Sequence, residues 1–398
     1  MSYEVSLSNQ PVLPTDDREM KLLDRRAYVS PDVFDQEISN VFHRQWTFVG
    51  HVSQVRDPGD YFTEDFAGES IVIVRGADHV VRAFLNTCRH RGHTLCQEKS
   101  GKAKSFTCPY HQWNYRLNGT LHRASAAPDG KFFDYKDWGL HPVSLEVWQG
   151  LIFIRLSATE TKPLKPDLDR VGQSVLPLQA EKLKEIRRET YKIKANWKTI
   201  IENYVECYHC LANHPELCVA LDANQTLSGI KDAWHGEYIG GASPLKEGMK
   251  TASLDGELVC QKMLGEVDAN AVDTGTVRGG FIIVPMITRV HFRADHGYIH
   301  TLRPISPGHS QWVTRWYVHE DAVEGEDYET EMVTRLWHIS NQQDISLCEE
   351  SYKGVLSKRF VSGPLHPERE AAIASVLTVY SDLMEGSGEP LSRDQVGA

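Results

Sequence analysis

The sequence predicts an α+β protein of two main domains: an antiparallel β domain first, then a domain in which helices flank an antiparallel sheet. Three observations favour this fold class. The chain has 398 residues, more than a single domain commonly holds. Short β-forming runs separated by turn residues fill residues 46–156. After that stretch, helical and strand patterns are mixed.

The expected elements place the domain boundaries. Residues 1–45 form a helical segment that packs on the C-terminal domain, with Asp32 as a possible helix cap. Residues 46–158 form the β domain, and residues 159–398 form the C-terminal domain. The segment TKPLKPDLD, with two prolines, is expected to link the two domains.

The C-terminal domain opens with KANWKTIIENYVECYHCLANHPEL, whose apolar residues follow a helical period. The runs GGFIIVPMITRVHF, GYIHTLRPI and QWVTRWYVH predict strands of an antiparallel sheet. Residues 329–356 return to a helical period. Helices before and after a run of strands are typical of an α+β domain.

Composition narrows the class of partner and the compartment. The formal net charge of −11 argues against binding to nucleic acid or to an anionic membrane surface. No run of about 18 apolar residues and no basic-then-apolar leader is present, so we expect no membrane span and a cytoplasmic protein. In that compartment the eight cysteines are expected to be reduced thiols or metal ligands rather than a disulfide framework.

Two cysteine–histidine pairs stand in the β domain, Cys88-Arg-His90 and, 17 residues later, Cys108-Pro-Tyr-His111. This order predicts a Rieske-type [2Fe–2S] site, in which two cysteines hold one iron and two histidines hold the other. Neutral imidazoles raise the cluster potential, so the cluster can pass electrons to an O₂ site. Zinc is the alternative, but Cys₂His₂ zinc sites have Cys-x₂₋₄-Cys and His-x₃₋₅-His order.

A second group of candidate ligands lies in ENYVECYHCLANHPEL. Glu202, Glu206 and His209 are spaced i, i+4 and i+7, which places them on one face of the expected helix. Pro215 disfavours helical geometry at His214, so the helix is expected to end there and the two histidines to converge. Two histidines at a helix end suit a 2-His-1-carboxylate iron site, although either histidine taken alone is more often structural.

The third ligand is expected from the late helix. Its apolar stripe includes Val333, Leu336, Trp337 and Cys348, and Asp344 falls on the same face. A carboxylate on a buried face needs a metal, a partner or a hydrogen bond. Asp344 is therefore the best candidate for the carboxylate of the iron site.

Both sets of residues resemble the oxygenase (alpha) subunits of Rieske non-haem iron oxygenases. The similarity lies in CRHRGHTL, CPYHQWNYRLNG, ANWKTIIENYVECYHC, HPEL and NQQDISLCEE, and it extends over about residues 40–360. It implies a Rieske domain at 46–158 and a catalytic domain with mononuclear Fe²⁺ at 159–398. The implied ligands are Cys88, His90, Cys108 and His111 for the cluster, and His209, His214 and Asp344 for the iron.

The resemblance also implies how electrons move. In this family one subunit's cluster serves the neighbouring subunit's iron, so we expect a ring, usually a homotrimer. An acidic residue just before the first iron histidine links the two centres, and Glu206 holds that position here. Most members have Asp, so Glu206 is a departure, and we associate it with members that act on quaternary ammonium compounds.

The expected function is a terminal oxygenase that takes electrons from NAD(P)H through a flavin- or ferredoxin-type reductase and activates O₂. An electron carrier is the remote alternative, but it would leave the second set of ligands unexplained. Within the family, the sequence most resembles the branch that acts on glycine betaine, stachydrine and carnitine-type compounds. Hydroxylation of an N-methyl group of such a compound releases formaldehyde. Hydroxylation or cis-dihydroxylation of an aromatic acid is the alternative.

A quaternary ammonium substrate would need an aromatic box for cation–π contact. The aromatic candidates are Tyr204, Trp234, Phe281, Phe292, Tyr298 and Trp316. A substrate carboxylate could be bound by Arg289, Arg293 or Arg303, although a surface role is the more common one for each of them.

Overall fold

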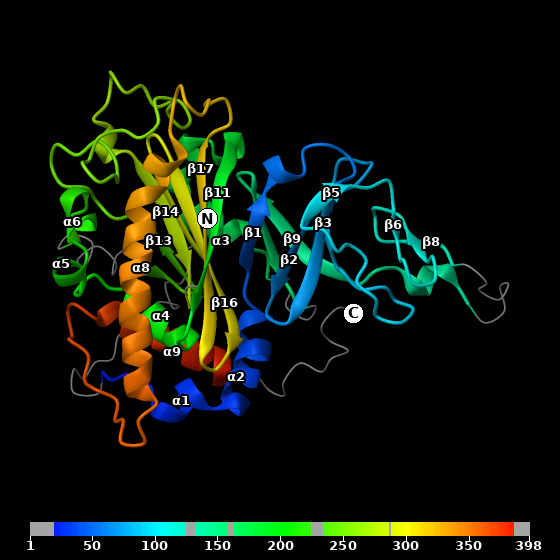
Figure 1. Cartoon of the computed structure of the whole chain (residues 1–398), viewed down its shortest axis with the longest axis horizontal. Coiled ribbons are helices and arrows are strands. Elements are labelled where there is room, and N and C mark those ends of the chain that lie inside the picture. Colours follow the sequence, from blue (N-terminus) through cyan, green and yellow to red (C-terminus); the bar gives the residue numbers. More distant parts are fainter. Residues whose placement is uncertain (1–19, 125–132, 158–161, 224–233, 286–287, 386–398) are drawn as a thin grey trace, which may run out of the picture. The chain divides into compact units, whose positions relative to one another are not determined.

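The computed structural model describes residues 20–124, 133–157, 162–223, 234–285 and 288–385. The chain divides into two compact units. The larger unit comprises Met1–Val41 and Pro163–Gly388, and the smaller unit comprises Phe42–Lys162 and Glu389–Ala398. Figure 1 shows a β-rich smaller unit and a larger unit that combines one sheet with helices, which confirms the predicted α+β class.

The smaller unit is antiparallel throughout. Its main sheet has seven strands in the order β1-β10-β9-β4-β3-β2-β5. A separate three-stranded sheet has the order β6-β7-β8. The strand bounds are β1 Thr47–His51, β2 Asp60–Phe66, β3 Glu69–Arg75, β4 Val81–Leu85, β5 Ser100–Lys102, β6 Phe106–Thr107, β7 Asn114–Tyr115, β8 Leu121–Arg123, β9 Pro142–Trp148 and β10 Leu151–Arg155.

The two cysteine–histidine loops connect short strands of this unit. The first loop follows β4 and the second joins β6 to β7. Their cysteines belong to an apolar core that includes Phe84, Phe106 and Trp113. The sheets therefore hold both loops by their buried cysteines.

The N-terminal segment differs from the single helix that residues 19–44 predict. It breaks at Ser30 into α1 (Arg25–Val29) and α2 (Pro31–Glu37), which continues as a π-helical turn, η2 (Ile38–Phe42). Asp32 is not a cap, because Ser30 is the N-cap residue and Asp32 lies in the first turn of α2. Pro31 suits the first helical position, where no backbone N–H is needed.

The segment TKPLKPDLD is not wholly a linker. Its second half forms α3 (Lys165–Val171), with a proline in the first turn. Leu164 and Leu168 are completely buried. Burial of these two leucines explains why a proline-containing stretch is helical here.

The larger unit is built on one seven-stranded antiparallel sheet in the order β11-β17-β16-β15-β14-β13-β12. The run GGFIIVPMITRVHF supplies two strands, β14 and β15, rather than one. The strand bounds are β11 Leu183–Ile193, β12 Trp234–His235, β13 Tyr238–Gly240, β14 Arg278–Ile283, β15 Thr288–Arg293, β16 Gly297–Ser306 and β17 His309–His319.

Helix α8 (Thr330–Val355) follows the sheet and crosses one of its faces, as Figure 1 shows. Its buried stripe of Val333, Leu336 and Trp337 packs with Trp316 and Val318 of β17 in one apolar cluster. The predicted helix over residues 329–356 is confirmed. Asp344 lies on the buried side of α8, two turns beyond Trp337.

The predicted helix before the histidines is shorter than expected. Helix α4 (Trp197–Tyr204) begins at the N-cap Asn196 and ends at Val205. Two one-turn helices follow, α5 (Cys210–Asn213) and α6 (Leu217–Ala220). The inference that Glu202, Glu206 and His209 share one helix face is therefore wrong: Glu202 lies in α4, whereas the other two lie beyond its end.

Buried polar contacts join the N-terminal segment and the last helix, α9 (Ala371–Glu385), to α4. The Glu37 carboxylate pairs with buried Lys198 and accepts hydrogen bonds from Trp197 and Tyr380 at 2.6 and 2.7 Å. Tyr28 donates to the Glu202 carboxylate at 2.6 Å. This network fixes the end of the sheet from which α4 leads to the histidines.

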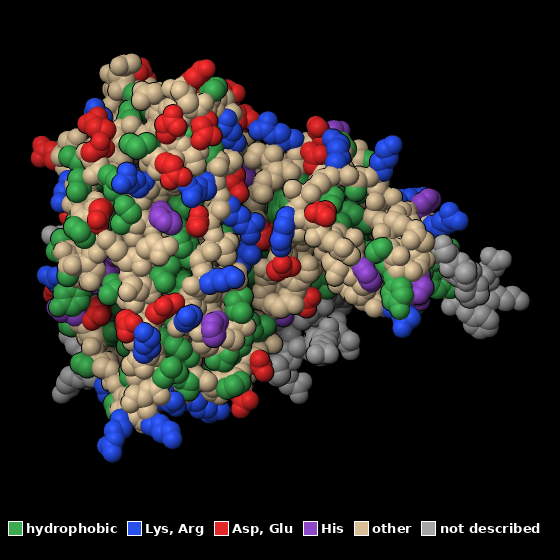
Figure 2. Space-filling model, viewed as in Figure 1, with side chains coloured by type: hydrophobic (Ala, Val, Ile, Leu, Met, Phe, Trp, Pro, Cys, Tyr) green, Lys and Arg blue, Asp and Glu red, His purple; other side chains and the backbone are tan. Residues whose placement is uncertain are grey.

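Acidic and basic side chains are interspersed over the face of the larger unit that Figure 2 shows. The excess negative charge is thus not gathered in one field on that face. Within the described part of the chain, no helix combines the length and apolar character that crossing a membrane requires.

Candidate metal centres

The two cysteine–histidine loops have the same backbone geometry. In the first, the Cys88 N–H donates to His93 O at 2.9 Å, and Cys88 O accepts from Gly92 N at 2.9 Å. In the second, the Cys108 N–H donates to Trp113 O at 2.8 Å, and Cys108 O accepts from Gln112 N at 3.0 Å. Gly92 and Gln112 both have positive φ, at 74° and 59°. Each loop therefore turns tightly about its own buried cysteine.

The loops bring the four predicted cluster residues together. Cys88 and Cys108 are 2% exposed, and their side chains contact each other. The His90 and His111 rings lie with centroids 4.6 Å apart. Tyr115 closes the buried side of the site, with its hydroxyl 3.3 Å from Cys88 Sγ and accepting from Arg89 N at 3.0 Å.

This donor set fits a [2Fe–2S] cluster. Burial raises the pKa of Cys108, so an apolar pocket would disfavour its thiolate without a metal. His111 Nδ1 is buried and has no hydrogen-bond partner among the described residues. The Trp113 ring stacks on His90 at 4.9 Å and fixes its orientation. Two buried thiols and two adjacent imidazoles are the ligands that a Rieske centre requires.

The second set of predicted ligands converges in the larger unit. His209 Nε2 lies 3.1 Å from His214 Nε2. Asp344 Oδ1 lies 2.9 Å from His214 Nε2 and 3.2 Å from His209 Nε2. Three ligands about 2.1 Å from one ion, on one face of an octahedron, are about 3 Å apart. The three atoms thus have the spacing of a facial triad.

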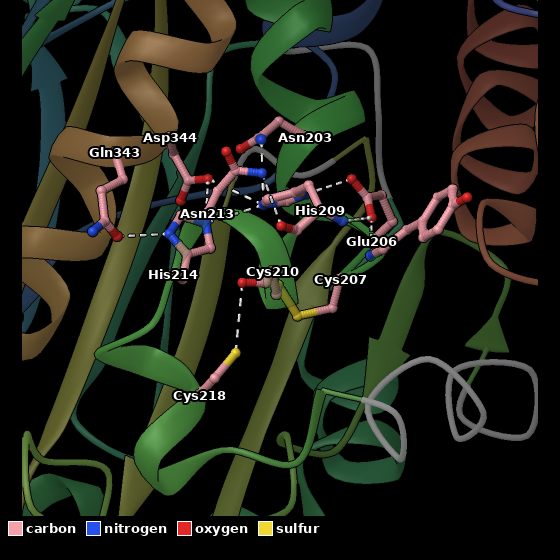
Figure 3. The surroundings of a disulfide bond; sticks show 11 residues. Asn203, Glu206, Cys207, His209, Cys210, Asn213, His214, Cys218, Gln343 and Asp344 are labelled. Carbon is pink, nitrogen blue, oxygen red and sulfur yellow. Dashed lines mark hydrogen bonds and ion pairs between the residues drawn. A yellow bond between two sulfur atoms is a disulfide. The ribbon is translucent and has the colours of Figure 1, made fainter.

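The remaining ring nitrogens are held by other side chains, as Figure 3 shows. Glu206 Oε1 lies 2.5 Å from His209 Nδ1, and Gln343 Oε1 lies 2.7 Å from His214 Nδ1. Each outer partner fixes the tautomer in which Nε2 is free to bind a metal. The sequence indicated Glu206, but the role of Gln343, next to Asp344 on α8, was not predicted.

Electrostatics at this site favour a cation. Burial lowers the pKa of His209, but the hydrogen bonds that its ring donates to the Asp344 and Glu206 carboxylates outweigh burial and raise the pKa to about 9. The pKa of His214 is also raised, because Asp344 outweighs burial. Burial raises the pKa of Asp344, but the two histidines lower it by more. Two carboxylates thus stabilise positive charge where the nitrogens meet.

Two cysteines flank His209, and they correct the expectation that every cysteine is a reduced thiol or a metal ligand. Cys207 and Cys210 form a disulfide. Both are buried, at 9% and 3% exposed. The Cys210 sulfur lies within 4.8 Å of the nitrogens of His209 and His214. Because the disulfide removes the Cys210 thiolate, Cys210 does not offer a thiolate ligand to a metal at this point.

A cavity of about 480 Å³ adjoins the three converging side chains, a volume typical of small-molecule sites. Of the aromatic candidates, Tyr204 lines it. Phe281, Phe292, Tyr298 and Trp316 are fully buried and do not line it. The Trp234 side chain lies outside the described part of the structure.

Trp337 also lines the cavity and was not predicted to do so. Of the three candidate arginines, Arg289 is a lining residue, and Arg278 is another that the sequence did not indicate. Arg293 and Arg303 are buried elsewhere in the sheet. The cavity is mainly apolar, with charged groups at a few points.

An antiparallel β unit with two cysteine–histidine loops, in one chain with a unit that holds a facial triad, defines a Rieske-type oxygenase. Residues 45–135 match the Rieske [2Fe-2S] domain, and residues 180–386 match the family described as "Ring hydroxylating alpha subunit (catalytic domain)". The chain belongs to this family of oxygenase alpha subunits, whose cofactors are a Rieske [2Fe–2S] cluster and a mononuclear iron.

The chain is similar to oxygenase subunits of known activity. It is 32% identical to the glycine betaine monooxygenase oxygenase subunit of Pseudomonas aeruginosa, over 90% of this chain and 87% of that protein. It is 37% identical to the carnitine monooxygenase oxygenase subunit of Escherichia coli, over 62% of this chain and 67% of that one.

Solved structures share the fold. A quaternary ammonium Rieske monooxygenase of 25% identity superposes with a TM-score of 0.71, covering 92% of this chain and 95% of that one. Naphthalene 1,2-dioxygenase from Rhodococcus sp. superposes with a TM-score of 0.70 at 19% identity, with the same coverage.

Proposed function

We propose that this chain is the oxygenase component of a monooxygenase that removes an N-methyl group from a betaine-type quaternary ammonium compound. The observation that carries the proposal is the convergence of His209, His214 and Asp344 at the wall of a cavity of about 480 Å³. The relatives that act on glycine betaine and carnitine favour this substrate class.

We assign Cys88, His90, Cys108 and His111 to the cluster and His209, His214 and Asp344 to the iron. When bound, the cluster supplies single electrons and the iron activates O₂. The chain's own part is to hold the donors. Glu206 and Gln343 orient the two imidazoles, and Tyr204, which donates to Asn341 at 2.7 Å, forms part of the wall.

Glu206 is assigned a second role, as the link between the cluster of one subunit and the iron of the next in a homotrimer. Its two carboxylate oxygens are used differently: Oε1 contacts His209 Nδ1, whereas Oε2 accepts from the backbone of Tyr208 and His209. The loop thus fixes the carboxylate next to an iron ligand. The structure of the quaternary ammonium Rieske monooxygenase gave insights into inter-subunit electron transfer in that protein, which supports this assignment.

One C–H bond of an N-methyl group and one O₂ give a hydroxymethyl group and water, with two electrons and two protons. The C–N bond then breaks: its electron pair stays on the nitrogen as a tertiary amine, the carbon leaves as formaldehyde, and the hydroxyl proton is released to water. The electrons come from NAD(P)H through a flavin- or ferredoxin-type reductase, so the proposal places the protein in the cytoplasm.

The test is a substrate panel with a reductase, NADPH and NADH, assayed for formaldehyde and for ring diols. At least one of glycine betaine, carnitine and stachydrine should yield formaldehyde in step with NAD(P)H consumption. Oxidised products from benzoate, without formaldehyde from any betaine, would favour the aromatic-acid alternative instead.

A further inference from the structure

The cavity next to the three candidate iron ligands contains two cationic side chains, Arg278 of β14 and Arg289 of β15. The lining also has two carboxylates, Glu206 and Asp344, but both are engaged by His209 and His214. We propose that Arg289 binds a carboxylate of the substrate. The site would then select a zwitterionic betaine over a quaternary ammonium cation without an acid group, a step that builds on the proposed function.

Among the residues that the structure describes, Arg289 has no anionic partner. It is partly buried, and its guanidinium makes no hydrogen bond or ion pair with any residue that the structure describes. Arg278, by contrast, is exposed, so water can solvate its charge. A partly buried cation without an anion is unfavourable, and an anion that enters the cavity would relieve that cost.

The described groups of the sheet whose titration Arg289 affects are neutral. Together with burial, its charge lowers the pKa values of His291 and His300, so both rings are neutral at pH 7. Burial raises the pKa of Tyr298, and Arg293 on the same strand is a second cation. None of these groups can neutralise Arg289, so the positive potential remains directed at the cavity.

Arg289 and Asp344 act on the same side chain. Burial and the charge of Asp344 raise the pKa of Tyr204, whereas the charge of Arg289 lowers it. Tyr204 therefore lies within electrostatic reach of both the candidate iron site and the arginine. A small molecule whose carboxylate binds Arg289 can present its other end to the nitrogens and oxygen of the triad.

The same cavity suits the other end of a betaine. The Trp337 and Tyr204 rings line it, and aromatic faces attract methylated ammonium groups. An arginine repels such a group when no carboxylate accompanies it. Arg289 therefore acts on specificity by favouring the acid and by disfavouring the bare cation.

The experiment measures binding to the cluster-loaded, iron-loaded protein by anaerobic calorimetry, without reductant, so that no turnover occurs. The probes form two matched pairs: glycine betaine with choline, and benzoate with benzyl alcohol. The variants are Arg289→Gln and Arg289→Lys, with Arg335→Gln of the exposed face of α8 as the matched control. Thermal unfolding and cluster absorbance verify that each variant is folded.

Wild-type protein should bind glycine betaine and bind choline much more weakly. Arg289→Gln should weaken the binding of glycine betaine about tenfold to a hundredfold, and it should leave the affinity for choline unchanged or higher. Arg289→Lys should retain part of the affinity, because it keeps the charge but loses the two-point geometry. Arg335→Gln should match wild type for every probe.

Equal wild-type affinity for glycine betaine and choline, unchanged glycine betaine binding in Arg289→Gln, or binding of neither carboxylate probe would overturn the assignment of Arg289. A different result would be that wild type binds benzoate but not glycine betaine, and that Arg289→Gln no longer binds benzoate. In that case the proposed substrate class fails, whereas Arg289 keeps its role. The two failures are thus distinguishable.

Discussion

His214 Nε2 lies 2.9 Å from Asp344 Oδ1, although 130 residues separate them in the chain. The contact joins the short loop after α4 to the middle of α8. His209 Nε2 completes the group at 3.1 Å from His214 and 3.2 Å from Asp344. This triangle links the fold to the proposed chemistry.

The cluster assignment predicts that His111 is essential and that His93, in the first loop, is not. His111→Ala should lose the low-average-g Rieske EPR signal, because one iron loses a ligand. His93→Ala should keep it, since the His93 ring contacts a backbone carbonyl at 2.6 Å instead. An unchanged signal in His111→Ala would refute the ligand set.

The bridge assignment concerns electron transfer rather than metal binding. Glu206→Gln should keep both metals but slow reoxidation of the pre-reduced cluster by at least about tenfold, because the link between the imidazoles loses its charge. Glu206→Asp should be intermediate. Stopped-flow absorbance in a single turnover with substrate and O₂ gives the rate. Wild-type reoxidation in Glu206→Gln would return this residue to a local capping role.

The disulfide predicts a thiol count. Unfolded, cluster-free protein prepared without reductant should show six reactive thiols, since Cys207 and Cys210 are paired and six cysteines are free. Reduction should raise the count to eight. Cys207→Ser should show seven without reduction, because its partner becomes free. Eight thiols in unreduced wild type would show that the pair is a dithiol in solution.

Glu202 predicts a pH dependence of stability. Burial raises the pKa of Glu202, whereas the hydrogen bond from Tyr28 and the charge of Lys198 lower it. Burial has the larger effect, so the pKa is raised to about 7. An unfolded glutamate titrates near about 4.3, so the unfolded state releases its proton first as the pH rises. Protonated Glu202 therefore makes its full contribution to the free energy of unfolding below the pKa of the unfolded state. That contribution is lost as the pH rises through the folded-state pKa of about 7.

Urea titrations give the free energy of unfolding at each pH. Between about pH 5 and pH 8, this free energy should fall in wild type, relative to Glu202→Gln, by on the order of 3 kcal/mol. The amide oxygen in this variant can still accept the Tyr28 hydrogen bond. Glu331→Gln, which changes an exposed acid on α8, should track wild type. Parallel curves for wild type and Glu202→Gln would contradict the raised pKa.

The strands and α8 could be predicted because burial imposes a period on their sequences. β11 was missed, because its sequence LKEIRRETYKI is rich in charge. It lies at the edge of the sheet, where charged side chains reach solvent. Helix α9 was also missed: its residues are apolar nearly all round and leave little contrast between faces.

The ligand residues could be predicted from their types and spacing, but the path of the backbone between them could not. The helical period continues past Tyr204, yet the helix ends there because Glu206 Oε2 accepts from the N–H groups of Tyr208 and His209. Capping by a side chain leaves no periodic signal. Gln343 was missed for a similar reason, since an amide beside a carboxylate has many other uses.

The central claim is that His209, His214 and Asp344 bind one iron, separate from the cluster. Iron and acid-labile sulfide analysis of purified protein tests it most directly. Wild type should contain about three irons and two sulfides per chain. Asp344→Asn should contain about two of each, keep its cluster spectrum and lose more than about 99% of activity. The control, Glu350→Gln on the exposed side of α8, should equal wild type. Three irons and full turnover in Asp344→Asn would contradict the claim.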